Sequence, residues 1–447
     1  MITTRIPPSP TGHLHIGTVR TALFNYLFSR HYKGRFVFRS EDTDKARSKK
    51  EFEVEIIEGL QALGLTWDNT EEVVRQSERG EIYRRYLEEG IGNGKLFLSQ
   101  EESKQNPGET VEVVRLKNPN KEIVFNDLIR GEIAFDTTEL GDLVVARSID
   151  DALYHFTVVV DDHEMGVTHV LRGEDHISNT PRQILIQEAL GFERPEYAHL
   201  PLILAPDRSK MSKRHGAVAV AEYLNEGFLP EAIINYLALL GWNPGTDQEI
   251  FTLEELVEQF DIAKVHKSGA VFDRQKFLWI NKEHLNRLSD DVYLGLLKTA
   301  LPDSITSLSQ YDDERMQRLM PTIRERINIF GEFTDAAAAG EYDFAFAHPD
   351  VDPALLKWKK DPDLTASEVR LRAVYELLQN ADFSSPESIK AAVWDYAEKE
   401  GRGEVLWPMR VALTGLERSP DPFTVAHIIG REDTLHRIKI ACDKIGE

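Results

Sequence analysis

Cysteine is almost absent from this sequence, and long apolar runs are missing altogether. The only cysteine among the 447 residues is Cys442, which excludes an internal disulfide and a thiolate metal cluster. No run approaches the roughly 18 apolar residues that a membrane span requires, and the opening Met-Ile-Thr-Thr-Arg lacks the apolar core of a signal peptide. These absences predict a cytoplasmic protein without a membrane partner.

Positive charge is also scarce. Lysine and arginine together number 53 against 75 aspartates and glutamates, which gives a net charge of −22. Nucleic-acid binding depends on neutralising phosphates, so this balance taken alone argues against a polyanionic partner. One stretch is an exception, because residues 207–216, DRSKMSKRHG, gather several cations in a predicted loop. An acidic protein can therefore still carry a basic edge.

The N-terminal stretch from Arg5 to Asn25, RIPPSPTGHLHIGTVRTALFN, combines a stiff loop with the start of a helix. Its three prolines fix the backbone, while Gly12 lets the loop approach a ligand closely. An apolar stripe from Val19 onward predicts a helix whose N-terminus lies near Gly17 and Thr18 and offers an anion site. His13 and His15 are expected on one side of an extended segment. The alternative interpretation is an ordinary strand, loop and helix with two surface histidines.

The segments that follow indicate a parallel α/β sheet with an insertion. Residues 35–40 are typical of a buried strand, and Ser48 with Glu51 predicts a capping box for the next helix. Short β-rich pieces between about 95 and 155 predict the insertion. The α/β pattern then resumes, with a helix over 180–190 and an apolar strand over 199–205. In such sheets ligands gather at the carboxyl ends of the strands, and beyond residue 216 the patterns are mostly helical.

Two motifs in this order and spacing resemble the signatures of class I aminoacyl-tRNA synthetases. They are PPSPTGHLHIG near the N-terminus and SKMSKR about two hundred residues later. The surrounding words RSEDTD, VVVDDHEMGVTHVLRGEDHISNTPRQ, LPLILAPDRSKMSKRHG, GFLPEAIINYLALLGW, VFDRQKFLWIN and PMRVALTG resemble bacterial-type glutamyl-tRNA synthetase over nearly the whole chain.

The resemblance implies a multidomain fold of α/β and all-α parts. A Rossmann-type catalytic domain with a parallel sheet would comprise residues 1–90 and 156–215, and an inserted α+β acceptor-binding domain residues 91–155. A stem-contact domain over 216–305 and a helical anticodon-binding domain over 306–447 would follow. Length alone predicts about three domains, since one core cannot serve 447 residues.

The resemblance also implies a two-step reaction. Glutamate attacks the α-phosphate of ATP to form glutamyl-adenylate and pyrophosphate, and the glutamyl group then moves to the terminal adenosine of tRNA(Glu). Residues matching the two signatures would hold the charge that builds on the phosphates, with His15, Lys213 and Lys210 as the catalytic ones. The expected ATP-binding residues are His15, Gly17, Thr18, Asp175, His176, Met211, Lys213 and Arg214.

Glutamate carries two carboxylates and one ammonium, so its site should be mostly cationic with one anionic corner. The positions that match the family's glutamate site are Arg5, Ser9, Glu41, Tyr154 and Arg172. The alternative interpretations are that Arg5 and Glu41 form a structural ion pair and that Tyr154 belongs to the core. The expected tRNA contacts are Asp44, Arg324, Arg326, Trp407 and Arg410, because aromatic and arginine side chains suit unpaired bases.

ATP with Mg²⁺ is the expected substrate complex, and the family resemblance implies a monomer that needs tRNA for glutamate activation. Many relatives hold zinc in the insertion, but residues 96–117 here contain no Cys and no His, so no zinc is expected. A non-discriminating enzyme that also charges tRNA(Gln) is the main alternative. A small-molecule nucleotidyltransferase would leave the helical C-terminal half without a role, and a non-catalytic RNA-binding relic should have lost His15, Lys213 or Glu41. Glutaminyl-tRNA synthetase is disfavoured, since a neutral amide would not need two arginines.

Overall fold

The computed structural model describes residues 1–71, 73–102, 108–209, 211 and 219–446. The chain divides into two compact units, residues 1–284 and 285–447, and the division falls within helix α9 (Arg274–Arg287). The predicted boundary near 305 lies beyond this division. The finer division into four domains stays a prediction.

The parallel sheet of unit 1 combines strands from both sides of the insertion. Strands β1 (Thr3–Ile6), β2 (Arg35–Ser40) and β3 (Val74–Arg75) pair in parallel in that order, and β10 (His169–Gly173) pairs in parallel with β11 (Glu196–Leu200). The Thr168 amide donates to the Thr3 carbonyl at 3.0 Å, so β10 starts beside β1. The carboxyl ends of β1 and β10 therefore meet at one edge.

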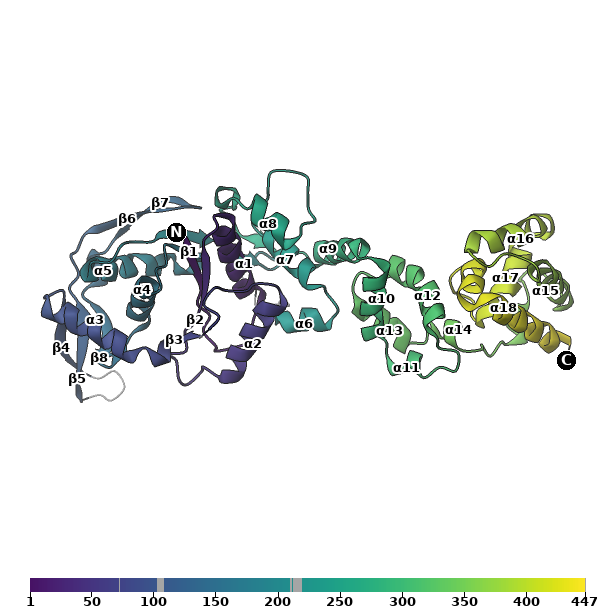
Figure 1. The fold of residues 1–447 in the computed structure, drawn as a ribbon, viewed down its shortest axis with the longest axis horizontal. Coiled ribbons are helices and arrows are strands. Elements are labelled where there is room, and N and C mark those ends of the chain that lie inside the picture. Colours follow the sequence, from purple (N-terminus) through teal and green to yellow (C-terminus); the bar gives the residue numbers. More distant parts are fainter. Residues whose placement is uncertain (72, 103–107, 210, 212–218, 447) are drawn as a thin grey trace. The chain divides into compact units, whose positions relative to one another are not determined.

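Helices cover this sheet because their apolar residues are buried against it. Phe24 and Leu27 of the first helix are buried, and this helix packs against β1, β2 and β10. Figure 1 shows α1 on one side of β1 and α4 on the other. The helices of this part are α1 (Ile16–His31), α2 (Lys50–Ala62), α3 (Gly80–Gly92), α4 (Tyr154–Glu164) and α5 (Thr180–Leu190), with 3₁₀ turns η1 (Gln76–Glu78) and η3 (Glu174–Asn179).

The insertion is β-rich, as its short alternating segments predicted, and it is joined to the main sheet. Its strands are β4 (Leu96–Glu102), β5 (Thr110–Leu116), β6 (Glu122–Asp127), β7 (Gly131–Asp136), β8 (Leu143–Ser148) and β9 (Asp151–Ala152), with the 3₁₀ turn η2 (Thr138–Leu140). Strands β4, β5, β8 and β9 form an antiparallel sheet. Strand β6 pairs with β11 at Asp127 and Tyr197, so the insertion reaches the edge of the parallel sheet.

The remainder is mostly helical, which confirms the predicted fold class of α/β followed by all-α parts. Unit 1 continues with β12 (Ile203–Leu204), α6 (Val220–Asn225), α7 (Pro230–Leu239), α8 (Leu253–Gln259), the 3₁₀ turn η5 (Ile262–Lys264) and β13 (Ala270–Val271). Unit 2 contains α10 (Asp290–Thr299), α11 (Asp303–Thr306), α12 (Asp313–Arg326), α13 (Phe330–Ala338), α14 (Asp343–Phe346), η6 (Pro353–Leu356), α15 (Thr365–Leu378), α16 (Pro386–Glu400), α17 (Arg402–Thr414) and α18 (Pro422–Gly446).

Two local predictions were wrong. The N-cap of α2 is Lys49 and has no side-chain capping bond, so Ser48 and Glu51 form no capping box. The Ser48 and Lys49 amides instead donate to the carbonyls of Asp44 and Pro10, which places the helix start one residue later than the pattern predicted. The predicted strand over 199–205 is two strands, because the chain leaves β11 at Leu200 and resumes pairing at β12.

Candidate active site

A cavity of about 460 Å³ lies where the carboxyl ends of β1 and β10 meet the N-terminus of α1. The structure brings eleven of the predicted site residues together in its wall. They are Arg5, Ser9, His15, Gly17, Thr18, Glu41, Tyr154, Arg172, Asp175, His176 and Met211. The predicted Lys210, Lys213 and Arg214 lie outside the described residues. Residues distant in the sequence thus share one surface at the predicted edge of the sheet.

His15 immediately precedes α1, which begins at Ile16, one residue before the expected start near Gly17. It is the N-cap, and its Nδ1 accepts a hydrogen bond from the Thr18 amide at 3.3 Å. The Thr18 hydroxyl lies 3.2 Å from His15 Nε2. A Cβ at Gly17 would lie 3.1 Å from His15 Nδ1, so the absence of a side chain there makes room for the imidazole. The helix N-terminus, with its partial positive charge, therefore opens on the cavity beside an imidazole.

His13 is exposed like His15, with the buried Leu14 between them, but it does not join the site. Its Nδ1 lies 2.7 Å from Glu55 Oε2, more than half of its side chain is exposed, and it is not part of the cavity wall. Glu55 also accepts from the Leu14 amide at 3.2 Å. The alternation of exposed and buried residues over 13–15 agrees with the expected extended segment, but only His15 lines the cavity.

Arg172 carries a buried positive charge toward the cavity and is only 6% exposed. Its Nη1 donates to Gln183 Oε1 at 2.7 Å, its Nη2 to Thr180 Oγ1 at 2.8 Å and its Nε to His199 Nε2 at 3.2 Å. Among the residues that the structure describes, no carboxylate forms an ion pair with it. Burial lowers the pKa of the Arg172 guanidinium, because its charge is desolvated without a local counterion. An anionic ligand would supply that missing charge.

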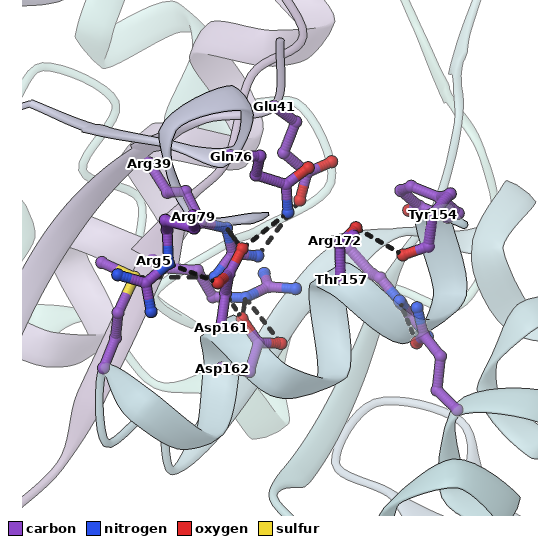
Figure 2. A network of polar contacts seen from close by, with 12 residues as sticks. Arg5, Arg39, Glu41, Gln76, Arg79, Tyr154, Thr157, Asp161, Asp162 and Arg172 are labelled. Atoms are coloured by element: carbon purple, nitrogen blue, oxygen red, sulfur yellow. Dashed lines mark hydrogen bonds and ion pairs between the residues drawn. The ribbon is translucent and has the colours of Figure 1, made fainter. Parts of the chain in front are cut away.

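Arg5 and Glu41 both line the cavity but do not pair with each other, contrary to the alternative interpretation. Arg5 Nε lies 3.3 Å from Asp162 Oδ1, while Glu41 Oε1 accepts from Arg39 Nη2 at 3.1 Å. Arg39 Nη1 also donates to Asp162 Oδ1 at 2.8 Å, so Arg39 links the two pairs (Figure 2).

Arg39 and Asp162 were not predicted from the sequence. Each has a sequence signal in retrospect, because Arg39 interrupts the apolar strand 35–40 and Asp162 is the second of two aspartates that follow a run of three valines. A charged residue inside an apolar segment needs a partner when it is buried. The sequence does not say which partner, since the two residues are 123 positions apart.

The wall nearest α5 holds His176 and Tyr154. The Tyr154 hydroxyl lies 3.4 Å from His176 Nδ1, so Tyr154 faces the cavity rather than the core. Burial lowers the pKa of His176 to about 4, and the neighbouring Arg172 acts in the same direction. At neutral pH His176 is therefore a neutral imidazole that can donate or accept a hydrogen bond.

Arg20 is a cavity residue that the sequence analysis missed. It is buried in α1, its Nη1 donates to the Leu240 carbonyl at 3.1 Å, and its Nη2 contacts the Pro201 carbonyl. Burial lowers its pKa to about 10. The sequence pattern gave no sign of this role, because Arg20 lies among the apolar residues of the helix. Only the tertiary structure shows that it lines the cavity.

A second cavity, of about 950 Å³, lies in unit 2 and combines indoles with cations. Trp407 and Arg410 line it, as do Trp358, Trp394, Lys357, Lys359, Lys390 and Arg402. Lys390 Nζ and the Arg402 guanidinium lie 4.3 Å and 4.6 Å from the centre of the Trp394 ring. The Trp407 indole donates to the Leu355 carbonyl at 2.8 Å, which orients its ring in the wall. Such a surface suits anionic ligands with flat rings.

The other predicted tRNA contacts do not line either cavity. Arg324 Nη1 lies 2.9 Å from Asp290 Oδ1 and its guanidinium 4.2 Å from the centre of the Tyr293 ring. Arg326 pairs with Glu341 at 3.0 Å. Asp44 is paired with the exposed Arg47 at 2.7 Å.

No group of three or more His, Cys, Asp and Glu side chains suited to a metal ion occurs in the described part of the chain. The expectation of no zinc stays an expectation. No helix among the described residues is both long enough and apolar enough to cross a bilayer.

Comparison with known proteins identifies two families along the chain. The family described as tRNA synthetases class I (E and Q), catalytic domain, matches residues 1–106 and 95–279, and the family described as anticodon binding domain matches residues 282–442. A glutamate–tRNA ligase of Thermodesulfovibrio yellowstonii is 38% identical, and the match covers 99% of this chain and all of that protein. One of Nitratidesulfovibrio vulgaris is 41% identical over 98% of each chain.

Solved structures give the same result. The crystal structure of a glutamate tRNA ligase from Elizabethkingia meningosepticum, in complex with its amino acid, superposes with a TM-score of 0.86 at 32% identity and covers 99% of each chain. The glutamate-tRNA synthetase from Elizabethkingia anophelis superposes with a TM-score of 0.83 at 31% identity, again over 99% of each chain.

Proposed function

This chain belongs to the glutamate–tRNA ligases, a family of class I aminoacyl-tRNA synthetases, and from that premise we propose how its cavities perform the reaction. The enzyme activates L-glutamate with ATP and transfers the glutamyl group to tRNA, releasing AMP and pyrophosphate. The acceptor in this proposal is the 3′-terminal adenosine of tRNA(Glu).

The glutamate site is the part of the cavity between β1 and β10. Arg5 and Arg172 bind carboxylate oxygens, and the carboxylate of Glu41 receives the α-ammonium group with help from Ser9. Tyr154 adds a hydroxyl. The single observation that carries this assignment is the buried Arg172, which faces the cavity and has only neutral hydrogen-bond partners among the described residues. A buried cation of this kind favours an anionic substrate.

The ATP site is the part of the cavity at the N-terminus of α1. The imidazole of His15 and the first amides of the helix face the phosphates, Gly17 leaves room for the nucleotide, and Thr18 holds the imidazole. The other wall residues proposed to contact ATP are Asp175, His176 and Met211. Lys210, Lys213 and Arg214, outside the described ranges, would neutralise the phosphates as pyrophosphate leaves. Mg²⁺ would arrive with ATP as part of the substrate.

The tRNA partner is assigned to both units. Trp407 and Arg410 in the cavity of unit 2 would contact unpaired anticodon bases, since indole and guanidinium faces stack on bases. Asp44 is proposed near the terminal adenosine, with residues 91–155 binding the acceptor end and 216–305 the stem. Arg324 and Arg326 are weaker candidates for tRNA contacts, because both already form ion pairs within unit 2. A cytoplasmic monomer that needs tRNA for activation completes the proposal.

The decisive experiment is glutamate-dependent ATP–pyrophosphate exchange, run without RNA, with tRNA(Glu) and with tRNA(Gln), while charging of each RNA is followed. Exchange and charging with tRNA(Glu) alone are expected. Charging of both RNAs would establish the non-discriminating alternative, and exchange that ignores RNA would contradict the proposed tRNA requirement. No exchange under any condition would overturn the catalytic assignment in favour of an RNA-binding relic.

A further inference from the structure

We propose that Arg39 is a positioning residue that holds the two halves of the glutamate site, Arg5 and Glu41, in one fixed arrangement. The inference rests on the proposed function, because it assumes that Arg5 and Glu41 bind the substrate. Arg39 itself is fully buried in β2 and is not part of the cavity wall. It would therefore act on the substrate only through the residues that it holds.

One guanidinium contacts both halves of the site. Arg39 Nη2 donates to Glu41 Oε1 at 3.1 Å, and its Nη1 donates to Asp162 Oδ1 at 2.8 Å. Asp162 in turn accepts from Arg5 Nε at 3.3 Å through the same oxygen. Because the guanidinium is planar and its donors have fixed directions, it sets the distance between the two carboxylates that it binds. Figure 2 shows these side chains converging from β1, β2 and α4.

The remaining edge of Arg39 faces an anchored carboxylate. Its Nε lies 3.7 Å from Asp161 Oδ2. Asp161 is held by Gln76 Nε2 at 2.8 Å, by Arg79 Nε at 2.7 Å and by the Tyr83 hydroxyl at 2.8 Å. These contacts come from one continuous stretch of the chain, η1 and the start of α3 with the residue between them, so Asp161 is anchored by three side chains at once.

The positive charge of Arg39 also affects the ionisation of Glu41. Burial raises the pKa of Glu41, and Arg39 is the strongest influence in the opposite direction, followed by Arg5. Asp162 raises it further, and Tyr154 is the other titratable group that faces Glu41. Glu41 must be ionised to receive an ammonium group. Without the Arg39 charge, ionisation of Glu41 would require a higher pH, so glutamate binding would improve as pH rises.

The test compares Arg39→Lys, Arg39→Gln and the control Arg79→Gln in glutamate-dependent exchange with saturating tRNA(Glu). Lysine keeps the charge, but its single ammonium cannot span both carboxylates, so the KM for glutamate should rise about tenfold or more while the KM for ATP stays within about twofold. In Arg39→Gln the KM for glutamate should also fall between about pH 6 and about pH 9, and this fall should be larger than in the wild type. Arg79→Gln removes one of the three anchors of Asp161 and contacts neither Glu41 nor Asp162. Because Gln76 and Tyr83 still hold Asp161, both constants should stay near wild type.

Several outcomes would overturn the proposal. They are an unchanged KM for glutamate in Arg39→Lys, a parallel rise of both KM values, or the same effect in Arg79→Gln. If the Arg39 variants do not fold, Asp162→Asn tests the same link, since it keeps the side-chain shape but removes the charge shared by Arg5 and Arg39. Absence of exchange in the wild type would instead refute the proposed function. Calorimetric binding of glutamate to wild type and Arg39→Lys would then decide the positioning role separately.

Discussion

At the scale of single residues, the buried arginines of unit 1 differ in what balances their charge. Arg39 lies among three carboxylates, which raise its pKa although burial acts to lower it. Arg172 has neutral partners only among the described residues, and burial lowers its pKa. Both charges were desolvated on folding, but only that of Arg39 is compensated inside the protein. The uncompensated charge is therefore where we propose that an anionic substrate binds.

The first prediction concerns Arg172. In Arg172→Lys the planar fork is lost while the charge is kept, so the KM for glutamate should rise about 100-fold, with a much smaller change for ATP. Exchange kinetics measure both constants. The matched control is Arg182→Gln, which removes a nearby half-buried cation that is outside the cavity wall and donates to the Ser178 carbonyl at 2.6 Å. An equal effect of the two substitutions would contradict the assignment.

The second prediction concerns pH and stability. Burial lowers the pKa of His155 to about 4, and the neighbouring Arg182 and Arg172 act in the same direction. An unfolded histidine titrates near 6.5, so between these values the unfolded chain binds the proton and the folded chain does not. The stability that His155 contributes is therefore complete above about pH 6.5 and is lost as pH falls toward 4, by on the order of 1–3 kcal/mol.

Melting temperatures recorded from about pH 7 to about pH 4.5 test this prediction. In His155→Gln the loss of stability on acidification should be smaller than in the wild type. The control is His266→Gln, which alters an exposed histidine of the same unit and should leave the pH dependence as it is. A wild-type slope in His155→Gln would refute the prediction.

At the scale of elements, the start of α1 shows how a loop and a helix form a site together. His15 caps the helix with its own side chain, and Gly17 supplies the space that the ring occupies. The N-terminus of α1 thereby presents an imidazole and its first amides to the same cavity. Because the residue that ends the loop is also the N-cap of α1, the position of its imidazole is tied to the axis of the helix.

The third prediction is that Gly17→Ala impairs ATP use without destabilising the protein. Its Cβ would lie 3.1 Å from His15 Nδ1 and 3.2 Å from Cε1, so the ring must shift, whereas alanine favours a helix over glycine. In exchange kinetics kcat/KM for ATP should fall by up to about tenfold, while the melting temperature stays unchanged. Gly12→Ala is the control in the same loop, because nothing lies within 4 Å of its added Cβ. A loss of stability in Gly17→Ala would show that the site is not the cause.

The fourth prediction separates a real capping box from an apparent one. The Glu255 amide donates to Thr252 Oγ1 at 3.2 Å, and the Thr252 amide donates to Glu255 Oε2 at 2.8 Å, so Thr252→Ala should cost about 1 kcal/mol. Ser48→Ala should cost much less, because Ser48 does not cap α2. Denaturant unfolding of unit 1 in the full chain measures both. Similar losses of stability in the two variants would instead support the capping box predicted at Ser48 and Glu51.

At the scale of the whole molecule, the net charge of −22 conceals local cationic surfaces. The cavity of unit 2 places lysine and arginine side chains beside three indoles, and its wall contains only two acidic residues, Glu387 and Asp421. Such a surface can attract a polyanion although the molecule as a whole repels one. Contact with RNA in this protein therefore depends on where the cations lie rather than on their number.

The fifth prediction is that Arg410→Ala weakens tRNA use selectively. The KM for tRNA(Glu) in charging should rise about tenfold, while the KM for glutamate and for ATP at saturating tRNA stays unchanged. Arg372→Ala is the control, because Arg372 is exposed and pairs with Glu368 on its own helix at 2.8 Å. If Arg372→Ala had the same effect, general electrostatics rather than the cavity would explain the loss.

Much of the site could be predicted because its residues occupy local positions with a chemical meaning. Arg5 and Arg172 are in strands at their carboxyl ends, and Glu41 directly follows another, so the rule for parallel sheets predicted that they would converge. Helix 180–190 was confirmed to the residue. The boundaries of α2 could not be predicted as well, since a pattern of the Ser-x-x-Glu type does not distinguish helix starts one residue apart.

The sequence by itself determined the family, the order of α/β and helical parts, and eleven of the residues that line the cavity at the sheet edge, because motifs and periodicity are local properties of the chain. Only the tertiary structure decided which charges pair. Arg39 and Asp162 are 123 positions apart, and Asp127 of the insertion contacts His199, which in turn holds Arg172. The physical reason is that the free energy of a buried ion depends on its partners in space, and no local pattern records a contact between segments that meet only when the sheet forms.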